Sequence, residues 1–243
     1  MQFTTLNAGK LAAIALLAQV AVAHPTVEMK KRQTTPAILM GAAAGWGAIA
    51  ASTLTNVGNT LIIGSCGTYP GSEITGFPPG VCTATTSAAG TAASNAEAAC
   101  LTAYNNALAK VPTSALPASD LGGVTLPPGV YTFPTSAATL TGILTLDGAR
   151  SPRGQWIFQI TTTFDAAAAS QILTIGGAQA CNVYFIVGSS ATIEAGAQLV
   201  GNILAYTSIA ASDAASNNGS WCALNGEVTL INNALTAQSI CLT

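Results

Sequence analysis

Short apolar runs recur along the second half of the chain and are bounded by Gly, Pro, Asn or Ser. They are rich in Val, Ile, Thr and aromatic residues, and they begin at Val130, Trp156, Val183, Ile203 and Cys222, at intervals of 19 to 27 residues. A helix would require ten or more residues with a period of 3.6. The runs therefore predict β-strands.

Each apolar run is followed by a segment of small residues that holds one large apolar residue between short side chains. These segments are Thr139-Leu140-Thr141, Thr163-Phe164-Asp165, Thr192-Ile193-Glu194, Ser208-Ile209-Ala210 and Thr229-Leu230-Ile231. The repeat length fits one coil of a β-solenoid, in which a coil buries its apolar face by stacking on its neighbours. A propeller blade would require about 40 residues, roughly twice what is present.

The segment from Leu39 to Thr75 also alternates like strands and turns. Thr53-Leu54-Thr55 repeats the threonine-flanked pattern of the later coils, so this block is predicted to add one or two coils to the same solenoid. Pro78-Pro79 ends it, because proline cannot donate to a strand ladder.

Residues 87–111 differ from the rest because they are dense in alanine, with Cys100, Leu101, Tyr104 and Leu108 at helical spacing. We predict one long α-helix here, with Ser87 as a possible N-cap and Lys110 near the C-terminal dipole. In the runs 156–160 and 183–187, apolar residues occupy positions that face both sides of the strand, which predicts burial on both sides. The helix is expected to pack against them.

Alternation in the second strand of each coil places the central large residue inward and its two neighbours outward. The outward column before it reads Thr139, Thr163, Thr192, Ser208 and Thr229; the column after it reads Thr141, Asp165, Glu194, Ala210 and Ile231. Spacings of about 4.8 Å between coils and about 6.7 Å along a strand give a grid of hydroxyls and methyls similar to the oxygen repeats on ice planes. Thr145 and Thr174 form a weaker alternative set in the following strands.

The first residues read as targeting segments. Lys10 precedes the apolar stretch 11–23, which closes on Ala21-Val22-Ala23 and predicts a signal peptide over residues 1–23. Lys30-Lys31-Arg32 then predicts removal of a short pro-segment, residues 24–32, leaving a single solenoid domain over 33–243. The protein is expected to be secreted and extracellular.

Processing at Arg32 would leave no histidine, three cationic side chains and eight carboxylates, a formal net charge of −5. We expect neither nucleic acid nor membranes as partners, because binding to phosphates rests on clustered Lys and Arg. Catalysis by a Ser-His-Asp or Cys-His arrangement and His-based zinc are excluded. We expect no metal and no cofactor, and a monomer.

Six cysteines in a secreted chain predict three disulfides, with 15 possible pairings. The cysteines are Cys66, Cys82, Cys100, Cys181, Cys222 and Cys241. Cys66 with Cys82 would close a short loop, and Cys181 with Cys241 would attach the end of the chain to the solenoid. Asn218-Gly219-Ser220 is a sequon for N-glycosylation at Asn218.

Several longer segments carry a family resemblance. They are 52–58, 70–80, Asp120-Leu121-Gly122-Gly123, Pro128-Gly129-Val130-Tyr131, 156–160, 177–184, 187–192, 201–205 and 224–230. Through them the chain resembles fungal ice-binding proteins of the DUF3494 type from about Leu39 to Cys241. The resemblance implies a discontinuous right-handed β-solenoid with one long helix alongside, and adsorption to ice or ordered water through one flat face that inhibits ice growth and recrystallisation.

The expected ice-binding face consists of outward Thr, Ser and Ala side chains: Thr53, Thr55, Thr139, Thr141, Thr163, Thr192, Ser208, Ala210 and Thr229. Asp165 and Glu194 place carboxylates near this face. Two other functions use the same fold. A carbohydrate-active enzyme could use Asp165 and Glu194 as a catalytic pair, although we expect no enzymatic activity. A secreted adhesive or cell-wall solenoid that has lost ice binding is the other alternative.

Overall fold

The computed structural model describes residues 36–238 and Cys241, which belong to one compact unit, Thr35–Thr243. The predicted signal peptide and the basic triplet lie outside the described residues. Within the described part, no helix is both long and apolar enough to cross a membrane.

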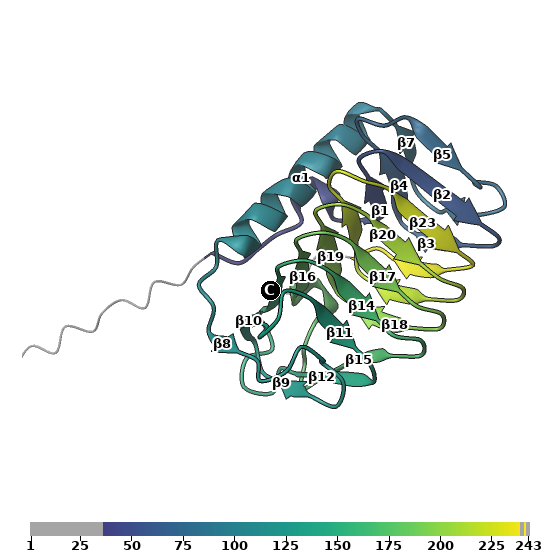
Figure 1. The fold of residues 1–243 in the computed structure, drawn as a ribbon. Helices are drawn as coiled ribbons and strands as arrows, with labels where there is room; N and C mark the ends of the chain where they lie inside the picture. The colour runs from purple at the N-terminus through teal and green to yellow at the C-terminus, as the bar shows by residue number, and fades with distance from the viewer. Residues whose placement is uncertain (1–35, 239–240, 242–243) are drawn as a thin grey trace, which may run out of the picture. The chain divides into compact units, whose positions relative to one another are not determined.

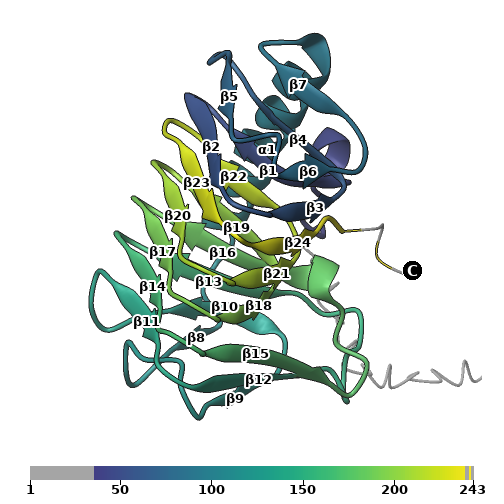
Figure 2. The same cartoon turned by 90° about the vertical axis from the view of Figure 1, so that its right-hand side faces the viewer.

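Three parallel sheets form the described fold, and most coils contribute one strand to each sheet (Figures 1 and 2). Sheet A consists, in spatial order, of β7 (Thr86–Ala88), β4 (Ser65–Thr68), β1 (Trp46–Ala50), β22 (Trp221–Ala223), β19 (Asn202–Ala205), β16 (Val183–Val187), β13 (Trp156–Ile160), β10 (Gly129–Thr132) and β8 (Ser114–Ala115). Sheet B consists of β11 (Ala138–Leu140), β14 (Phe164–Ala166), β17 (Ala191–Ile193), β20 (Ile209–Ala211), β23 (Val228–Ile231), β2 (Thr53–Val57) and β5 (Glu73–Thr75). Sheet C consists of β6 (Val81–Cys82), β3 (Leu61–Ile63), β24 (Ala234–Thr236), β21 (Ser216–Asn218), β18 (Gln198–Val200), β15 (Gln171–Ile175), β12 (Ile143–Asp147) and β9 (Thr125–Leu126).

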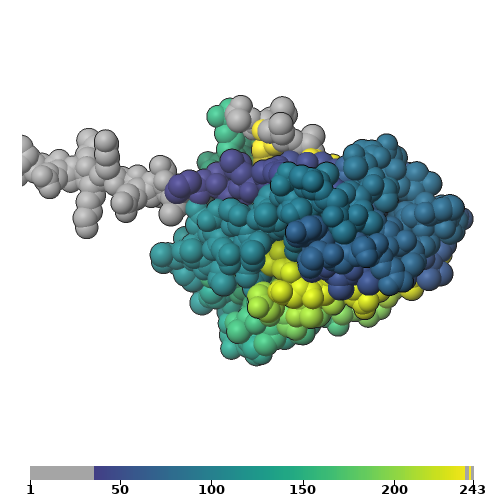
Figure 3. Space-filling view, turned by 90° about the horizontal axis from the view of Figure 1, so that it is seen from above, coloured from purple at the N-terminus to yellow at the C-terminus, as the bar shows by residue number. Residues whose placement is uncertain are grey.

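The solenoid is discontinuous along the chain. The first coil of the sequence stacks on the last one, since β1 pairs with β22, β2 with β23 and β3 with β24. The space-filling view shows the blue N-terminal coils against the yellow C-terminal coil (Figure 3). The prediction that residues 39–75 extend the same solenoid is therefore confirmed, and β-solenoid is the correct fold class.

A stack of large side chains fills the solenoid interior. Phe158 and Phe185 lie with ring centroids 4.7 Å apart, and Phe164 stacks on Phe185 at 4.9 Å. Each coil thus exposes apolar area that only its neighbours can bury. Burying this area stabilises the fold by about 25 cal/mol for each Å² removed from water. This mutual burial makes sheet B a rigid surface.

A second core lies between sheet A and helix α1 (Thr91–Leu108). The helix presents a strip of small residues, including Ala93, Ala96 and Ala103, to sheet A, where Ile157, Ile186 and Leu204 are buried. Strands β13 and β16 are therefore almost completely buried on both faces. The predicted packing of the helix against these two strands is confirmed.

The helix is shorter than the predicted range 87–111. Ser87 is not its N-cap, because Thr86–Ala88 form strand β7 and pair with β4, and Gly90 occupies the cap position without a side-chain hydrogen bond. At the other end, Lys110 lies beyond the helix and its Nζ donates to the carbonyl of Pro36. Residues 87–90 have the small-residue composition of the helix, so the sequence alone did not identify strand β7, which forms by pairing with β4.

Three disulfides connect distant parts of the described chain: Cys66–Cys82, Cys100–Cys222 and Cys181–Cys241. The first and third match the two pairings considered from the sequence, and the second joins helix α1 to sheet A.

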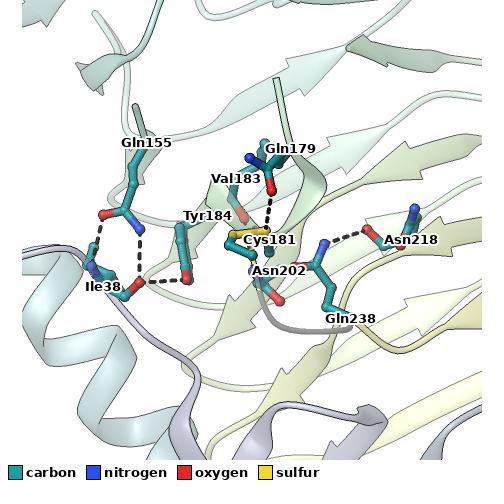
Figure 4. The surroundings of a disulfide bond; sticks show 10 residues. Ile38, Gln155, Gln179, Cys181, Val183, Tyr184, Asn202, Asn218 and Gln238 are labelled. Atoms are coloured by element: carbon teal, nitrogen blue, oxygen red, sulfur yellow. Dashed lines mark hydrogen bonds between the residues drawn. A yellow bond between two sulfur atoms is a disulfide. The ribbon is translucent and has the colours of Figure 1, made fainter. Parts of the chain in front are cut away.

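The segment before η1 (Gly41–Ala43) is held near the Cys181 disulfide (Figure 4). The Gln155 side chain exchanges hydrogen bonds of 2.8 and 2.9 Å with the backbone of Ile38, and the Tyr184 hydroxyl donates to the Ile38 carbonyl at 2.9 Å. These bonds fix the described N-terminal segment on sheet A.

Candidate functional site

The outer side of sheet B carries a column of small side chains that crosses all seven strands. Strand pairing places these residues side by side: Thr75, Thr55, Thr229, Ala210, Thr192, Asp165 and Thr139. Adjacent members are separated by the interstrand distance of about 4.8 Å. Five threonines and one alanine in register form a repetitive surface, which Asp165 interrupts near one end; we call it the middle column.

Two further columns flank the middle one, because every second residue of a strand points to the same side. The first flanking column lies two residues before the middle one and consists of Glu73, Thr53, Glu227, Ser208, Ser190 and Thr163. The second lies two residues after it and consists of Val57, Ile231, Ser212, Glu194, Ala167 and Thr141. All nine residues predicted for the face therefore lie on the outer side of sheet B.

The two predicted columns were nevertheless wrong in register. The prediction aligned Phe164 with Leu140 and Ile193, but Phe164 pairs with Ala138 and Ala191 instead. Large and small inward residues alternate from coil to coil: Ala138, Phe164, Ala191 and Ile209 in one row, and Leu140, Ala166, Ile193 and Ala211 in the next. A ring can then fill the space left by alanines above and below it.

The observed pairing differs from the predicted one by a shift of two residues along the strand. A shift of two keeps every side chain on its predicted face, whereas a shift of one would move each side chain to the opposite face. The shift does change which residues are neighbours on the outer surface. Thr163 and Ser208 move into a flanking column, while Asp165 and Ala210 move into the middle column beside Thr192.

Thr75 is the threonine of this surface that sequence reasoning missed. It pairs with Thr55 at the edge of sheet B and is exposed. Its segment Glu73-Ile74-Thr75 has one large apolar residue between two outward polar residues, as most of the other coils do, and that alternation could have identified it.

Hydroxyl groups differ between the columns. In the flanking columns, Thr53 Oγ1 donates to Glu227 at 3.4 Å and Ser212 Oγ donates to Glu194 at 3.2 Å. Among the side-chain hydrogen bonds of residues 36–238, none involves the hydroxyls of Thr55, Thr75, Thr192 or Thr229. These four threonines of the middle column therefore offer their hydroxyls to the solvent, whereas the Thr139 side chain bonds to Asp120 and the hydroxyls of the flanking columns are largely paired.

Asp120 closes one end of this surface. Its carboxylate accepts from the backbone N–H groups of Gly122 and Thr141 at 2.9 and 3.0 Å, and from the Thr141 hydroxyl. Burial alone would raise the pKa of Asp120, but these hydrogen bonds outweigh burial and hold the pKa below its usual value. The hydroxyl of Thr141 is thus committed to Asp120.

Asp165 and Glu194 are the charged exceptions near the middle column. Burial, and then the negative charge of Glu194, raise the pKa of Asp165. The exposed Asp165 lies on the open outer side of sheet B. A carboxylate at this point orders water around its own charge, in conflict with a regular lattice.

The corners between sheets B and C are also regular. One residue with positive φ stands at this corner in each of several coils: Gly58, Ala169, Gly196, Ala214 and Asn232, with φ from 49° to 78°. Such conformations favour glycine and tolerate asparagine. The repeated corner ends the strands of sheet B at similar positions.

Sheet C has a less even outer side. Exposed Ile63, Leu173 and Ile175 protrude from it, and exposed Asn218 of the sequon lies in β21. Thr145 pairs with Leu173, and Thr174 pairs with Leu146, so the two threonines of the alternative set do not share a column.

Comparison with known proteins agrees with this architecture. The family model for Ice-binding-like proteins matches residues 48–236. An ice-binding protein from Nostoc sp. (strain HG1) is 43% identical over 199 residues, which cover 82% of this chain and 73% of that protein. Ice-binding protein K3-B1 of Typhula ishikariensis is 32% identical over 218 residues, covering 81% of this chain and 87% of that protein.

A solved structure is also similar. The crystal structure of the ice-binding protein from the Antarctic ascomycete Antarctomyces psychrotrophicus superposes with a TM-score of 0.78 at 40% identity, covering 84% of this chain and all of that one. The family match and these relatives extend over most of the described solenoid. The chain belongs to the Ice-binding-like family.

Proposed function

We propose that this protein binds ice through the outer side of sheet B, with the middle column at the centre of the contact. The observation that carries the proposal is the register of Thr75, Thr55, Thr229, Ala210 and Thr192 on five adjacent strands. Each threonine offers a methyl group and a free hydroxyl at a repeat of about 4.8 Å. Water held on this grid is arranged more like ice than like liquid.

The mechanism is adsorption. Bound protein prevents growth at its own position, so ice between bound molecules must advance with a curved front, which lowers the local freezing point and slows recrystallisation. Rigidity favours this binding, because a mobile surface would lose conformational entropy on contact. The interior aromatic stack, the disulfides and the helix support that rigidity.

The protein acts outside the cell, as a monomer and without enzymatic activity. Three disulfides favour an oxidising compartment, in agreement with the predicted signal peptide. A glycan at Asn218 would project from sheet C and leave sheet B accessible, since Asn218 lies in β21. Size-exclusion chromatography with light scattering and mass spectrometry before and after deglycosylation test these points.

The functional test is ice recrystallisation inhibition combined with crystal shaping. Faceted crystals and arrested coarsening at micromolar protein are expected for the wild type, and loss of both for Thr229→Tyr. The matched control is Thr236→Tyr, which places the same ring on exposed sheet C. Round crystals that coarsen as in buffer, from folded wild-type protein, would refute ice binding; equal activity of the two variants would refute the choice of sheet B.

A further inference from the structure

A cavity separate from sheet B lies between helix α1 and the segment that follows β4. Its volume is about 230 Å³, and its walls include Tyr69, Pro70, Leu101 and Leu224. Ser94 and Glu97 of the helix add the polar groups. Most of the helix residues that line it belong to the N-terminal half of α1.

Glu97 is unusual within this cavity. The residue is only 9% exposed, and its Oε2 atom has no hydrogen-bond partner. Burial raises the pKa of Glu97 to about 8 and is the sole cause of that shift, so no cation of the described chain offsets its charge. A buried acceptor without a partner costs about 1 to 3 kcal/mol, and more when it is ionised.

The chemistry of the walls identifies what would neutralise this group. An ammonium group in the cavity can pair with the Glu97 carboxylate, which belongs to the lining, and donate to Ser94 Oγ. Leu101, Leu224 and the Tyr69 ring would cover an attached alkyl chain, and an aromatic ring also attracts a cation. The volume exceeds the roughly 150 Å³ of an engineered cavity that binds benzene, so this site has room for a ligand of about six non-hydrogen atoms.

We propose that this cavity is a binding site for a small primary alkylammonium ion, with Glu97 as its anionic partner and Ser94 as a second acceptor. The site is independent of ice binding, because its residues lie on α1 and beside sheet A rather than on sheet B. No covalent step is involved.

The test is a titration of the purified protein with butylammonium at pH 8, followed by NMR and by calorimetry. Saturable binding is expected, with shifts confined to the amides around Glu97 and Tyr69. 1-Butanol, which has the same chain without the charge, is expected to bind at least tenfold more weakly. Affinity is expected to fall about 50-fold between pH 8 and pH 6, because the carboxylate fraction falls from about one half to about one hundredth.

Glu97→Gln retains the shape and removes the charge, so it is expected to abolish binding. Glu194→Gln on sheet B removes an equal charge elsewhere and is expected to bind like the wild type. Ser94→Ala, which is expected to weaken binding several-fold, is a second variant if Glu97→Gln does not fold. Equal binding of butanol and butylammonium, no saturable signal with folded wild type, or unchanged binding by Glu97→Gln would each overturn the proposal.

Discussion

Replacing Asp165 with threonine should strengthen ice binding. In the middle column, five uncharged residues lie in succession from Thr75 to Thr192, before Asp165 separates them from Thr139. Four interstrand steps of about 4.8 Å give an uninterrupted length of about 19 Å. Asp165→Thr would extend it to Thr139, six steps or about 29 Å, roughly 1.5 times longer. We expect thermal hysteresis to rise by at least about this factor.

Nanolitre osmometry at equal protein concentration measures the effect, and far-UV circular dichroism confirms the fold. Asp165→Asn removes the charge without supplying the methyl group, so an intermediate gain is expected. The repulsion between Asp165 and Glu194 is relieved in both variants. Unchanged or reduced hysteresis in correctly folded Asp165→Thr would refute the reasoning, because the register places this residue inside the column.

Three further predictions concern stability. Ala214→Gly, at φ 57°, should raise the free energy of unfolding by about 0.5 to 1 kcal/mol, whereas Gly196→Ala, at φ 69° in open space, should lower it by about 1 kcal/mol in urea unfolding. Burial raises the pKa of Glu97 from 4.5 to about 8, so between these pH values the unfolded chain releases a proton that the folded protein keeps. The free energy of unfolding should therefore fall by up to about 5 kcal/mol as the pH rises through this range. A urea midpoint equal at pH 5 and pH 9 would contradict this. The double variant Cys100→Ala with Cys222→Ala removes a cross-link between residues 122 apart and should lose about 2 to 5 kcal/mol, measured by calorimetry against the wild type.

The strands and the burial of most of them could be predicted from local pattern. Runs such as 156–160 and 183–187 are apolar at both parities, and that pattern alone required a covering layer on each side. Residues 86–88 could not be recognised as a strand, because their partner β4 lies about 20 residues earlier and their composition continues that of the helix.

The face could be predicted, but the register of its columns could not. Alternation with period two fixes which side a residue occupies, and it placed all nine predicted residues on the outer side of sheet B. It does not fix which residues of adjacent coils pair. That choice follows from three-dimensional volume, where Phe164 fits between Ala138 and Ala191. Glu97 could not be recognised as a candidate site from the sequence either. Its burial without a hydrogen-bond partner at Oε2 follows from how the helix packs.

Direct imaging of adsorption tests the central claim most closely. Fluorescently labelled wild type, Thr192→Tyr on the middle column and Thr236→Tyr on sheet C would each be presented to a single growing ice crystal. We predict that the wild type and Thr236→Tyr coat the crystal while folded Thr192→Tyr stays in solution. Coating by Thr192→Tyr, or exclusion of Thr236→Tyr alone, would contradict the assignment of the ice-binding surface to sheet B.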